Sequence, residues 1–246
     1  MDDKIQNHSR RSFLTTGAAL VAASGAGAGS KNARSAEVGD VTVSTLADAL
    51  NRLGHDPMAL AMTPEIKPLT SGSGTILGPA VITEWEAGNG RMTPGDVRSF
   101  MFDPLDRAAS GSLWIVAGGT NRMLSLFGGV IGVACKRNGI VGAVTDNACR
   151  DIATFEASGF PVFGKTTVPY GPGAFARPVA ANVPVVCGGV EVRPGDYVAA
   201  DADGVIVIPG EVYADVMETA SGILAKEQQV LDKIAAGVSL AEAYAL

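Results

Sequence analysis

The chain has 246 residues, of which 47% are hydrophobic and 18% are charged, and its formal net charge at pH 7 is −6. This amount of apolar material is enough for the core of one domain or of two small ones. The excess of acidic residues argues against nucleic acid and against an anionic membrane surface as partners, because both are themselves negatively charged.

The N-terminal segment has the features of an export signal. A twin arginine at 10–11 precedes a Phe-Leu pair and a short run rich in Ala and Gly. This order predicts a twin-arginine (Tat) leader, and the run is too short for a helix that spans a membrane. Cleavage after Ala28 and cleavage near Ala36 both fit. We expect residues 1–36 to be signal peptide and linker and residues 37–246 to be one domain, periplasmic and not attached to the membrane after export.

The first part of the mature chain is predicted to contain a helix, a strand and an exposed loop. Apolar residues recur at helical spacing over 44–54, and a glycine ends the run. Residues 74–86 alternate like a strand that is broken at Gly78-Pro79. The stretch 88–99 is rich in turn-forming residues, so we expect it to be an exposed loop.

The middle of the chain alternates between apolar strands and helical patterns. Buried strands are predicted at 112–119, 140–147 and 161–167, with helices at 121–139 and 150–159 between them. Strands separated by single helices and short links predict a parallel β-α-β-α-β core.

The last part of the chain has a different character. Residues 183–209 are divided by GG, PGD and DADG turns, as in a β-meander or small barrel. One long amphipathic helix is predicted over 211–237, and a capping box of Ser239 and Glu242 starts another. The predicted fold class is therefore α/β, with a parallel βαβαβ core, a β-rich C-terminal half and a terminal amphipathic helix.

Few residues of the mature chain suit nucleophilic or transition-metal chemistry. Its single histidine is His55, and its three cysteines form no CxxC pair. A Ser-His-Asp or Cys-His hydrolase, a disulfide framework and a zinc site are therefore disfavoured. Lys136 and Lys165 leave a lysine Schiff base open, although Lys136 near a helix end favours a surface role. Any metal must be held mainly by oxygen ligands, which favours Mg²⁺ or Mn²⁺.

Arg150 and Asp151 stand at the junction between the second predicted strand of the core and its following helix. In open α/β folds, ligands bind beyond the carboxyl ends of the strands, where such junctions lie. An arginine can hold a carboxylate with two hydrogen bonds, and an adjacent aspartate can coordinate a hard cation. The alternative is that Asp151 caps its helix and Arg150 is solvated. The local pattern alone slightly favours this alternative.

Several spaced motifs resemble one family. VTDNACRD (144–151), followed by PVF (161–163), is similar to the VxDGxxRD and PVF pattern of the 4-hydroxy-4-methyl-2-oxoglutarate aldolases. Residues 125–142 resemble the helix and Gly-containing loop of that family, and 182–209 resemble its PGD and DGV segment. The likeness runs from about Val43 to the C-terminus. These class II pyruvate aldolases share a fold with the regulator of ribonuclease activity A, so the resemblance implies a swivelling β/β/α-type domain, a single aldolase-like catalytic domain.

The resemblance implies a metal-dependent carbon–carbon lyase. It would cleave 4-hydroxy-2-oxo acids to pyruvate through a metal-stabilised enolate, and oxaloacetate decarboxylation would pass through the same enolate. Arg150 would bind the carboxylate of the small 2-keto acid substrate, and Asp151 would hold Mg²⁺ or Mn²⁺ with the help of waters. The substrate's carboxylate or enolate would also receive hydrogen bonds from backbone amides, those of Gly128, Gly129, Val130 and Ile131.

The same family implies a homotrimer or homohexamer with the site near a subunit interface. Glu227 of a neighbouring copy would contribute a carboxylate there, and Asp146, in the same motif as Arg150, is a further candidate. Two positions depart from the family pattern. Asn147 replaces a glycine, which is tolerable if this residue has a positive φ. Gly129 stands where many members have Glu, a loss that affects turnover more than binding.

Two other functions remain open. One is a 2-keto acid binding protein without catalysis, and the other is a protein-binding regulator of a ribonuclease. The predicted export signal disfavours the regulator, because we expect such a protein in the cytoplasm.

Overall fold

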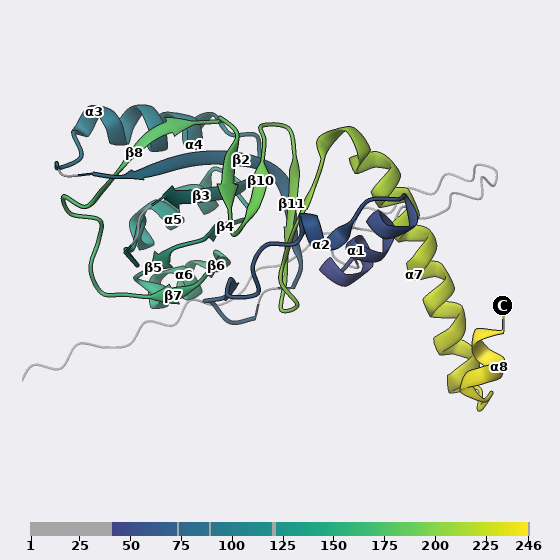
Figure 1. Cartoon of the computed structure of the whole chain (residues 1–246). Coiled ribbons are helices and arrows are strands. Elements are labelled where there is room, and N and C mark those ends of the chain that lie inside the picture. The colour runs from purple at the N-terminus through teal and green to yellow at the C-terminus, as the bar shows by residue number, and fades with distance from the viewer. Residues whose placement is uncertain (1–40, 73, 89, 120–121, 246) are drawn as a thin grey trace, which may run out of the picture. The chain divides into compact units, whose positions relative to one another are not determined.

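The computed structural model describes residues 41–72, 74–88, 90–119 and 122–245 (Figure 1). The predicted leader, residues 1–36, lies outside these ranges. Within them, no helix is both long enough and apolar enough to cross a membrane.

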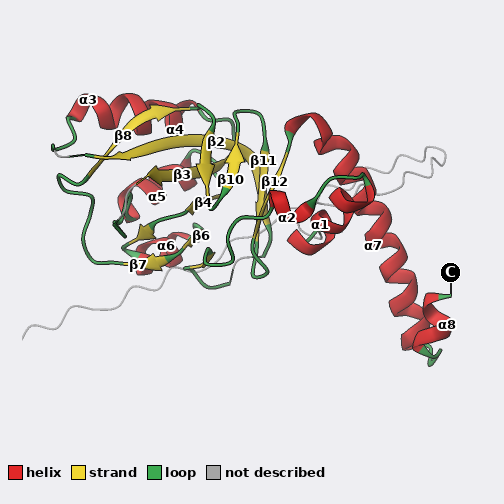
Figure 2. Cartoon of the chain, in the orientation of Figure 1, coloured by secondary structure: helices red, strands yellow, loops and turns green. Residues whose placement is uncertain are grey.

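Figure 2 shows the helices and strands of the described residues, with the strands β6 to β12 following one another without an intervening helix. The α-helices are α1 (Val43–Arg52), α2 (Pro57–Leu60), α3 (Pro94–Val97), α4 (Asp103–Arg107), α5 (Gly129–Arg137), α6 (Ile152–Ser158), α7 (Tyr213–Ala235) and α8 (Leu240–Tyr244), with a π-helical turn at Arg98–Phe102 and a 3-10 turn at Gly210–Val212. The strands are β1 (Lys67–Pro68), β2 (Ile76–Ala87), β3 (Leu113–Gly119), β4 (Gly142–Thr145), β5 (Ala148–Cys149), β6 (Val162–Gly164), β7 (Thr166–Thr167), β8 (Ala176–Ala181), β9 (Val185–Cys187), β10 (Val190–Val192), β11 (Tyr197–Ala200) and β12 (Val205–Ile208).

The main sheet is mixed and curled. Its strand order is β1-β6-β4-β3-β2-β11-β12, and β8 also pairs with β2. The neighbours β2, β3, β4 and β6 are parallel, whereas β1, β8, β11 and β12 pair antiparallel. The succession β3-α5-β4-β5-α6-β6 contains the predicted parallel core, with β5 as a short additional strand. The α/β fold class, its β-rich C-terminal half and its terminal helix are therefore confirmed.

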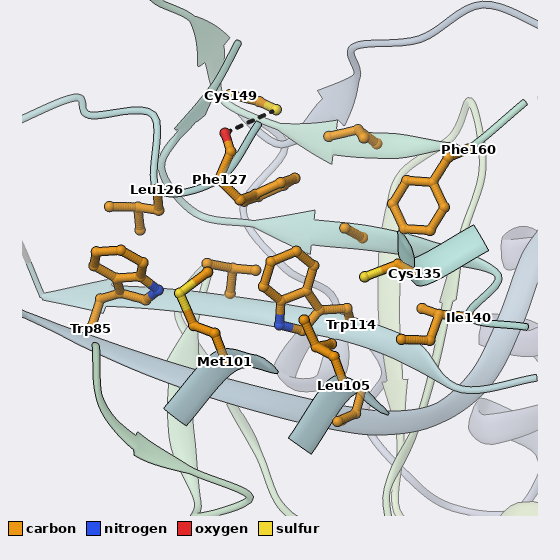
Figure 3. Close-up of a cluster of buried hydrophobic side chains, with 14 of the residues drawn as sticks. Trp85, Met101, Leu105, Trp114, Leu126, Phe127, Cys135, Ile140, Cys149 and Phe160 are labelled. Atoms are coloured by element: carbon orange, nitrogen blue, oxygen red, sulfur yellow. Dashed lines mark hydrogen bonds between the residues drawn. The ribbon is translucent and has the colours of Figure 1, made fainter. Parts of the chain in front are cut away.

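A cluster of buried hydrophobic side chains lies on one face of the parallel core (Figure 3). Trp114 of β3 packs there against Phe127, with ring centroids 4.7 Å apart, and Phe155 of α6 belongs to the same buried cluster. The Trp114 Nε1–H donates to Thr83 Oγ1 at 3.0 Å. The Nε1–H of Trp85 is buried in the same cluster and finds no acceptor among the described residues. A buried donor without an acceptor costs free energy, so the two tryptophans differ in what they contribute to stability.

The opposite face of β3 is covered by the C-terminal half of the chain. Ile115 and Phe163 pack there with Val185 and Val198. Strands β9 and β10 form a hairpin whose turn, Gly188-Gly189, has φ values of 57° and 87°. Positive φ at both central residues is the geometry of a type I′ turn, for which glycine is suited. This hairpin closes the second side of the sheet.

The terminal helix α7 packs on a third cluster. Val216, Ala220 and Ile223 are buried with residues of α1 and β12. Beyond this contact, α7 carries exposed apolar side chains, among them Leu231 and Ile234. Helix α8 contacts α7 and begins at the predicted capping box, where Ser239 Oγ lies 2.6 Å from a carboxylate oxygen of Glu242.

Two local predictions were wrong. The segment 88–99 was expected to be a loop, but Pro94 opens α3 after a capping box of Thr93 and Asp96, and the chain continues through the π-helical turn into α4. The helix expected over 121–139 begins only at Gly129. Ser125 instead forms a parallel bridge with Ala148, so the residues before Gly129 are extended because a distant strand pairs with them.

Candidate active site at the N-termini of α5 and α6

Asp151 adopts a strained backbone conformation. Its φ is 62° and its ψ is 35°, and among the described non-glycine residues only Asn182 shares a positive φ. This left-handed region is uncommon for a residue with a side chain, and such strain concentrates at functional sites. The Asp151 side chain makes no capping hydrogen bond to α6, although the residue occupies the N-cap position. The capping alternative for Asp151 is therefore wrong.

The Asp151 carboxylate turns instead to the N-terminus of α5. Its Oδ2 accepts a hydrogen bond of 3.0 Å from the Gly129 N–H and lies 3.7 Å from Nε of Arg150. About half of each side chain, 44% for Arg150 and 47% for Asp151, is exposed. Two segments that are 22 residues apart in sequence thus meet at one solvent-accessible place.

The four predicted backbone amides do not all remain available. Gly129 donates to Asp151, and the Ile131 N–H donates to the Gly128 carbonyl at 3.1 Å. The N–H groups of Gly128 and Val130 donate to no acceptor in the described part of the chain. These two amides, at a helix N-terminus, are suited to receive an anion.

Glycines make room for the Arg150 guanidinium. A Cβ on Gly128 would lie 3.1 Å from Arg150 Nε and 2.6 Å from Asp151 Oδ2, and a Cβ on Gly171 would lie 3.3 Å from Arg150 Nη1. The guanidinium therefore lies between the α5 N-terminus and the loop that contains Gly171. Sequence reasoning did not single out this loop, although its YGPG run is a turn signal.

Thr154 occupies the space beside Gly129. A Cβ on Gly129 would lie 2.6 Å from the Thr154 Cβ. A larger residue at position 129 would therefore require Thr154 to move. Glycine stands at position 129 where many family members have Glu, and the Thr154 side chain occupies the space that a side chain at 129 would need.

Buried residues directly precede both site segments (Figure 3). Phe127 lies before Gly128 and Cys149 before Arg150, and the Cys149 Sγ lies 4.0 Å from the Phe127 carbonyl oxygen. Burial raises the pKa of the Cys149 thiol to about 12. The thiol therefore stays protonated near neutral pH and serves as packing, not as a nucleophile.

Asp146 binds other backbone segments than Asp151 does. Its carboxylate accepts hydrogen bonds from the N–H groups of Gly118, at 3.1 Å, and Gly188, at 3.4 Å. Burial raises the pKa of this carboxyl above its usual value. Asp146 therefore ties the end of β3 to the β9–β10 turn.

Asn147 is tolerated at the family's glycine position for a different reason than expected. Its φ is not positive. Its side chain is buried, and Oδ1 accepts hydrogen bonds from the N–H groups of Leu124, at 2.8 Å, and Ala148, at 3.0 Å. Asparagine is thus accommodated because it supplies an acceptor to the segment leading into the site.

Glu227 is not brought to the site within one chain. It is exposed on α7, which packs against α1 and α8 at the end of the domain away from α5 and α6 (Figure 1). Among the described residues, no group of three or more His, Cys, Asp and Glu side chains is placed to hold a metal ion. A cation at this site would have Asp151 as its one carboxylate ligand from this chain.

The chain is similar to aldolases and RraA proteins. A family model described as RraA-like, Aldolase/RraA, matches residues 43–207. A protein of Halalkalibacterium halodurans named "Putative 4-hydroxy-4-methyl-2-oxoglutarate aldolase" is 30% identical over 184 residues, which are 73% of this chain and 78% of that protein. An uncharacterized protein of Methanocaldococcus jannaschii is 34% identical over 119 residues, which are 47% of this chain and 55% of that protein, so the match spans about half of its length.

A solved structure shows the same likeness. Streptomyces coelicolor RraAS2, described as an unusual member of the RNase ES inhibitor RraA protein family, is 26% identical with a TM-score of 0.64. The alignment covers 79% of this chain and 91% of that one.

Proposed function

Because the chain belongs to the RraA-like family, which groups aldolases with RraA proteins, we propose that it is a lyase that cleaves 4-hydroxy-2-oxo acids to pyruvate. Relatives named as putative 4-hydroxy-4-methyl-2-oxoglutarate aldolases support this substrate type. The observation that carries the proposal is the meeting of Arg150, Asp151 and the α5 N-terminus, with Asp151 held in a left-handed conformation.

Arg150 binds the 1-carboxylate of the substrate in this proposal. Its guanidinium is half exposed and lies between two glycines, so a carboxylate can approach it. A bidentate arginine–carboxylate pair fixes orientation as well as charge. The N–H groups of Gly128 and Val130 lie at the adjacent helix N-terminus and would receive a substrate oxygen that carries negative charge.

Asp151 anchors a divalent cation in this proposal. Its Oδ2 accepts from Gly129, and its Oδ1 bonds to no group in the described part of the chain. A single carboxylate fits Mg²⁺ or Mn²⁺ bound mostly through water, because Mg²⁺ dehydrates reluctantly and uses one or two protein carboxylates. When bound, the cation would supply Lewis-acid polarisation of the 2-oxo group. The same site would then decarboxylate oxaloacetate, which also yields the enolate of pyruvate.

A neighbouring copy completes the site in this proposal. Gly129 offers no carboxylate, so a general base must come from water or from Glu227 of another subunit of a homotrimer or homohexamer. Exposed apolar side chains support association: Val130 and Phe102 line a cavity of about 290 Å³ beside the α5 N-terminus, and Leu231 is exposed on α7. Exposed apolar clusters of this kind mark interaction surfaces.

We further propose that the twin-arginine leader directs the protein to the periplasm. The test is fractionation of cells that express the full chain and a variant with both arginines at 10–11 changed to lysine. The wild-type chain should appear in the periplasm and the variant in the cytoplasm; equal distribution of both would contradict the export proposal.

A pyruvate-release assay tests the lyase. The mature protein should release pyruvate from 4-hydroxy-4-methyl-2-oxoglutarate and from oxaloacetate with Mg²⁺ or Mn²⁺, and EDTA should abolish the release. Asp151→Ala and Arg150→Ala should each lose turnover while the fold is kept. The matched controls are Asp103→Ala and Arg107→Ala, because this pair has a similar separation of 3.6 Å and is accessible to solvent, with side chains 34% and 80% exposed. Undiminished activity in EDTA, or a wild-type rate in Asp151→Ala, would refute the mechanism.

A binding protein without catalysis is the second candidate. Gly129 favours it, because Thr154 fills the place where a carboxylate would stand. Pyruvate binding that depends on Arg150, with no turnover of either substrate by the assembled protein, would identify this function. Inhibition of a ribonuclease without binding of 2-oxo acids would instead point to a regulator, the role printed for the family of the Streptomyces protein.

A further inference from the structure

A cavity of about 460 Å³ lies next to Arg150. Its lining includes Arg122, Met123, Tyr170, Gly171 and Phe175. Gly171 connects it to the site, since a Cβ there would lie 3.3 Å from Arg150 Nη1. The volume falls within the range of about 300–1,000 Å³ that is usual for small-molecule pockets.

The walls of this cavity, which we call the Tyr170 pocket, are held by backbone hydrogen bonds. The Val168 N–H donates to the Cys149 carbonyl at 3.0 Å, and the Ser125 N–H donates to the Tyr170 carbonyl at 3.3 Å. At its far end, the Gly88 N–H donates to the Phe175 carbonyl at 2.9 Å. The loop between residues 168 and 175 is therefore attached to the strand that precedes Arg150, and its position relative to the site is fixed by the fold.

The lining of the Tyr170 pocket combines aromatic and apolar side chains with one cation, Arg122, which lies over an aromatic ring. Tyr170 is 54% exposed, Phe175 51% and Met123 39%. The Arg122 guanidinium carbon lies 4.5 Å from the centroid of the Phe175 ring, which is a cation–π contact. When an apolar group covers exposed aromatic rings in a concave site, apolar surface is removed from water and the free energy of the complex falls. The chemistry therefore matches an aryl or other bulky apolar group better than a small polar one.

We propose that the Tyr170 pocket binds the substituent at C4 of the substrate and selects 2-oxo acids with a bulky apolar end. The inference rests on the proposed function in one respect, the binding of the 1-carboxylate by Arg150. With that carboxylate held, the far end of the substrate lies against Tyr170 and Phe175, because Gly171 both lines this pocket and adjoins the Arg150 guanidinium.

Equilibrium binding tests this inference without turnover. The probes are 2-oxobutanoate and 4-phenyl-2-oxobutanoate, which lack the 4-hydroxyl group and so cannot undergo aldol cleavage. Isothermal titration of the full mature protein with Mg²⁺ present should give a dissociation constant on the order of tenfold lower for the phenyl compound, because its ring is buried on apolar surface; tenfold corresponds to about 1.4 kcal/mol.

Two variants of the wall and one control complete the experiment. Phe175→Ala and Tyr170→Ala should each reduce the ratio of the two dissociation constants to about threefold or less. Met58→Ala should keep the wild-type ratio, because Met58 is 86% exposed on α2 and lines none of the cavities at the site. Thermal unfolding of each variant separates loss of binding from loss of fold.

Each outcome is decisive for the pocket. A ratio near one in the wild-type protein, no binding of either probe, or an unchanged ratio in both Phe175→Ala and Tyr170→Ala would overturn the inference. Pyruvate release measured in parallel reports on the lyase alone. If no pyruvate is released but the phenyl compound still binds more tightly, the lyase is refuted and the pocket stands. If pyruvate is released but the two probes bind equally, the pocket is refuted and the lyase stands.

Discussion

Replacing Gly128 with alanine tests how closely the site is packed around its carboxylate. Gly128 has an extended backbone, with φ −149° and ψ −178°, which alanine adopts without strain. The added methyl group would instead lie 2.6 Å from Asp151 Oδ2 and 3.1 Å from Arg150 Nε. Both atoms are ends of half-exposed side chains, so they can move aside. The fold should therefore survive, while the two charged groups leave their positions.

The size of the effect follows from the bond that is displaced. The Gly129 N–H to Asp151 hydrogen bond is charge-assisted, and such bonds contribute about 1.5–3 kcal/mol. Because Asp151 regains water when it moves, we expect the free energy of unfolding to fall by only about 1 kcal/mol or less. The catalytic loss should be larger, about 10- to 100-fold in kcat/KM, since a misplacement of about 1 Å can cost a factor of 100.

The assay is the pyruvate-release rate, with denaturant unfolding of the same samples. Gly171→Ala is the graded comparison, because its methyl group would approach the Arg150 guanidinium no closer than 3.3 Å, at Nη1, and would not displace Asp151; its kcat/KM should fall a few fold. A wild-type rate in Gly128→Ala, or a greater loss in Gly171→Ala than in Gly128→Ala, would refute the reasoning that the carboxylate position limits turnover.

Three further predictions concern buried groups. Trp114→Phe should lower the free energy of unfolding by about 1 kcal/mol more than Trp85→Phe, because only Trp114 loses a hydrogen bond; equal losses in denaturant titrations would contradict this. Cys135 and Cys149, whose pKa burial raises to about 12, should not react with a thiol reagent at pH 8 until the protein unfolds; rapid labelling of the native protein would show that these sites open. Burial raises the pKa of Asp146 above 3.8, so its contribution to stability is largest at low pH and is lost as pH rises through the raised pKa. Asp146→Asn should therefore flatten the pH dependence of unfolding above about pH 4, and a pH profile that matches the wild type would count against the assignment.

The sequence was sufficient for the parallel core, and it placed Arg150 and Asp151 in the candidate site. Buried apolar runs predicted β3, β4 and β6 because each is covered on both faces. The junction rule placed Arg150 and Asp151 where ligands collect. Only the resemblance placed Asp151 and the segment of Gly129 at one site, because no local sequence pattern connects the two segments.

The remaining parts depended on contacts between distant segments. The stretch before Gly129 has a helical apolar pattern, yet it is extended because Ser125 pairs with Ala148. The same kind of long-range contact brings Gly171 to Arg150. For Asn147, sequence reasoning assigned the tolerance to backbone conformation, whereas buried hydrogen bonds from its side chain account for it. Local propensity carries no information on such partners.

At Asp151 the left-handed backbone favours glycine for stability, whereas the proposed function requires a carboxylate. Glycine would adopt φ 62° without the penalty of about 1 kcal/mol or more that an L-residue with a side chain carries. A selection for thermal resistance alone would therefore accept glycine at 151 and discard the carboxylate. Screening for a more stable variant of this protein would need to measure turnover at every round, because a gain in stability is available at the residue that we propose holds the cation.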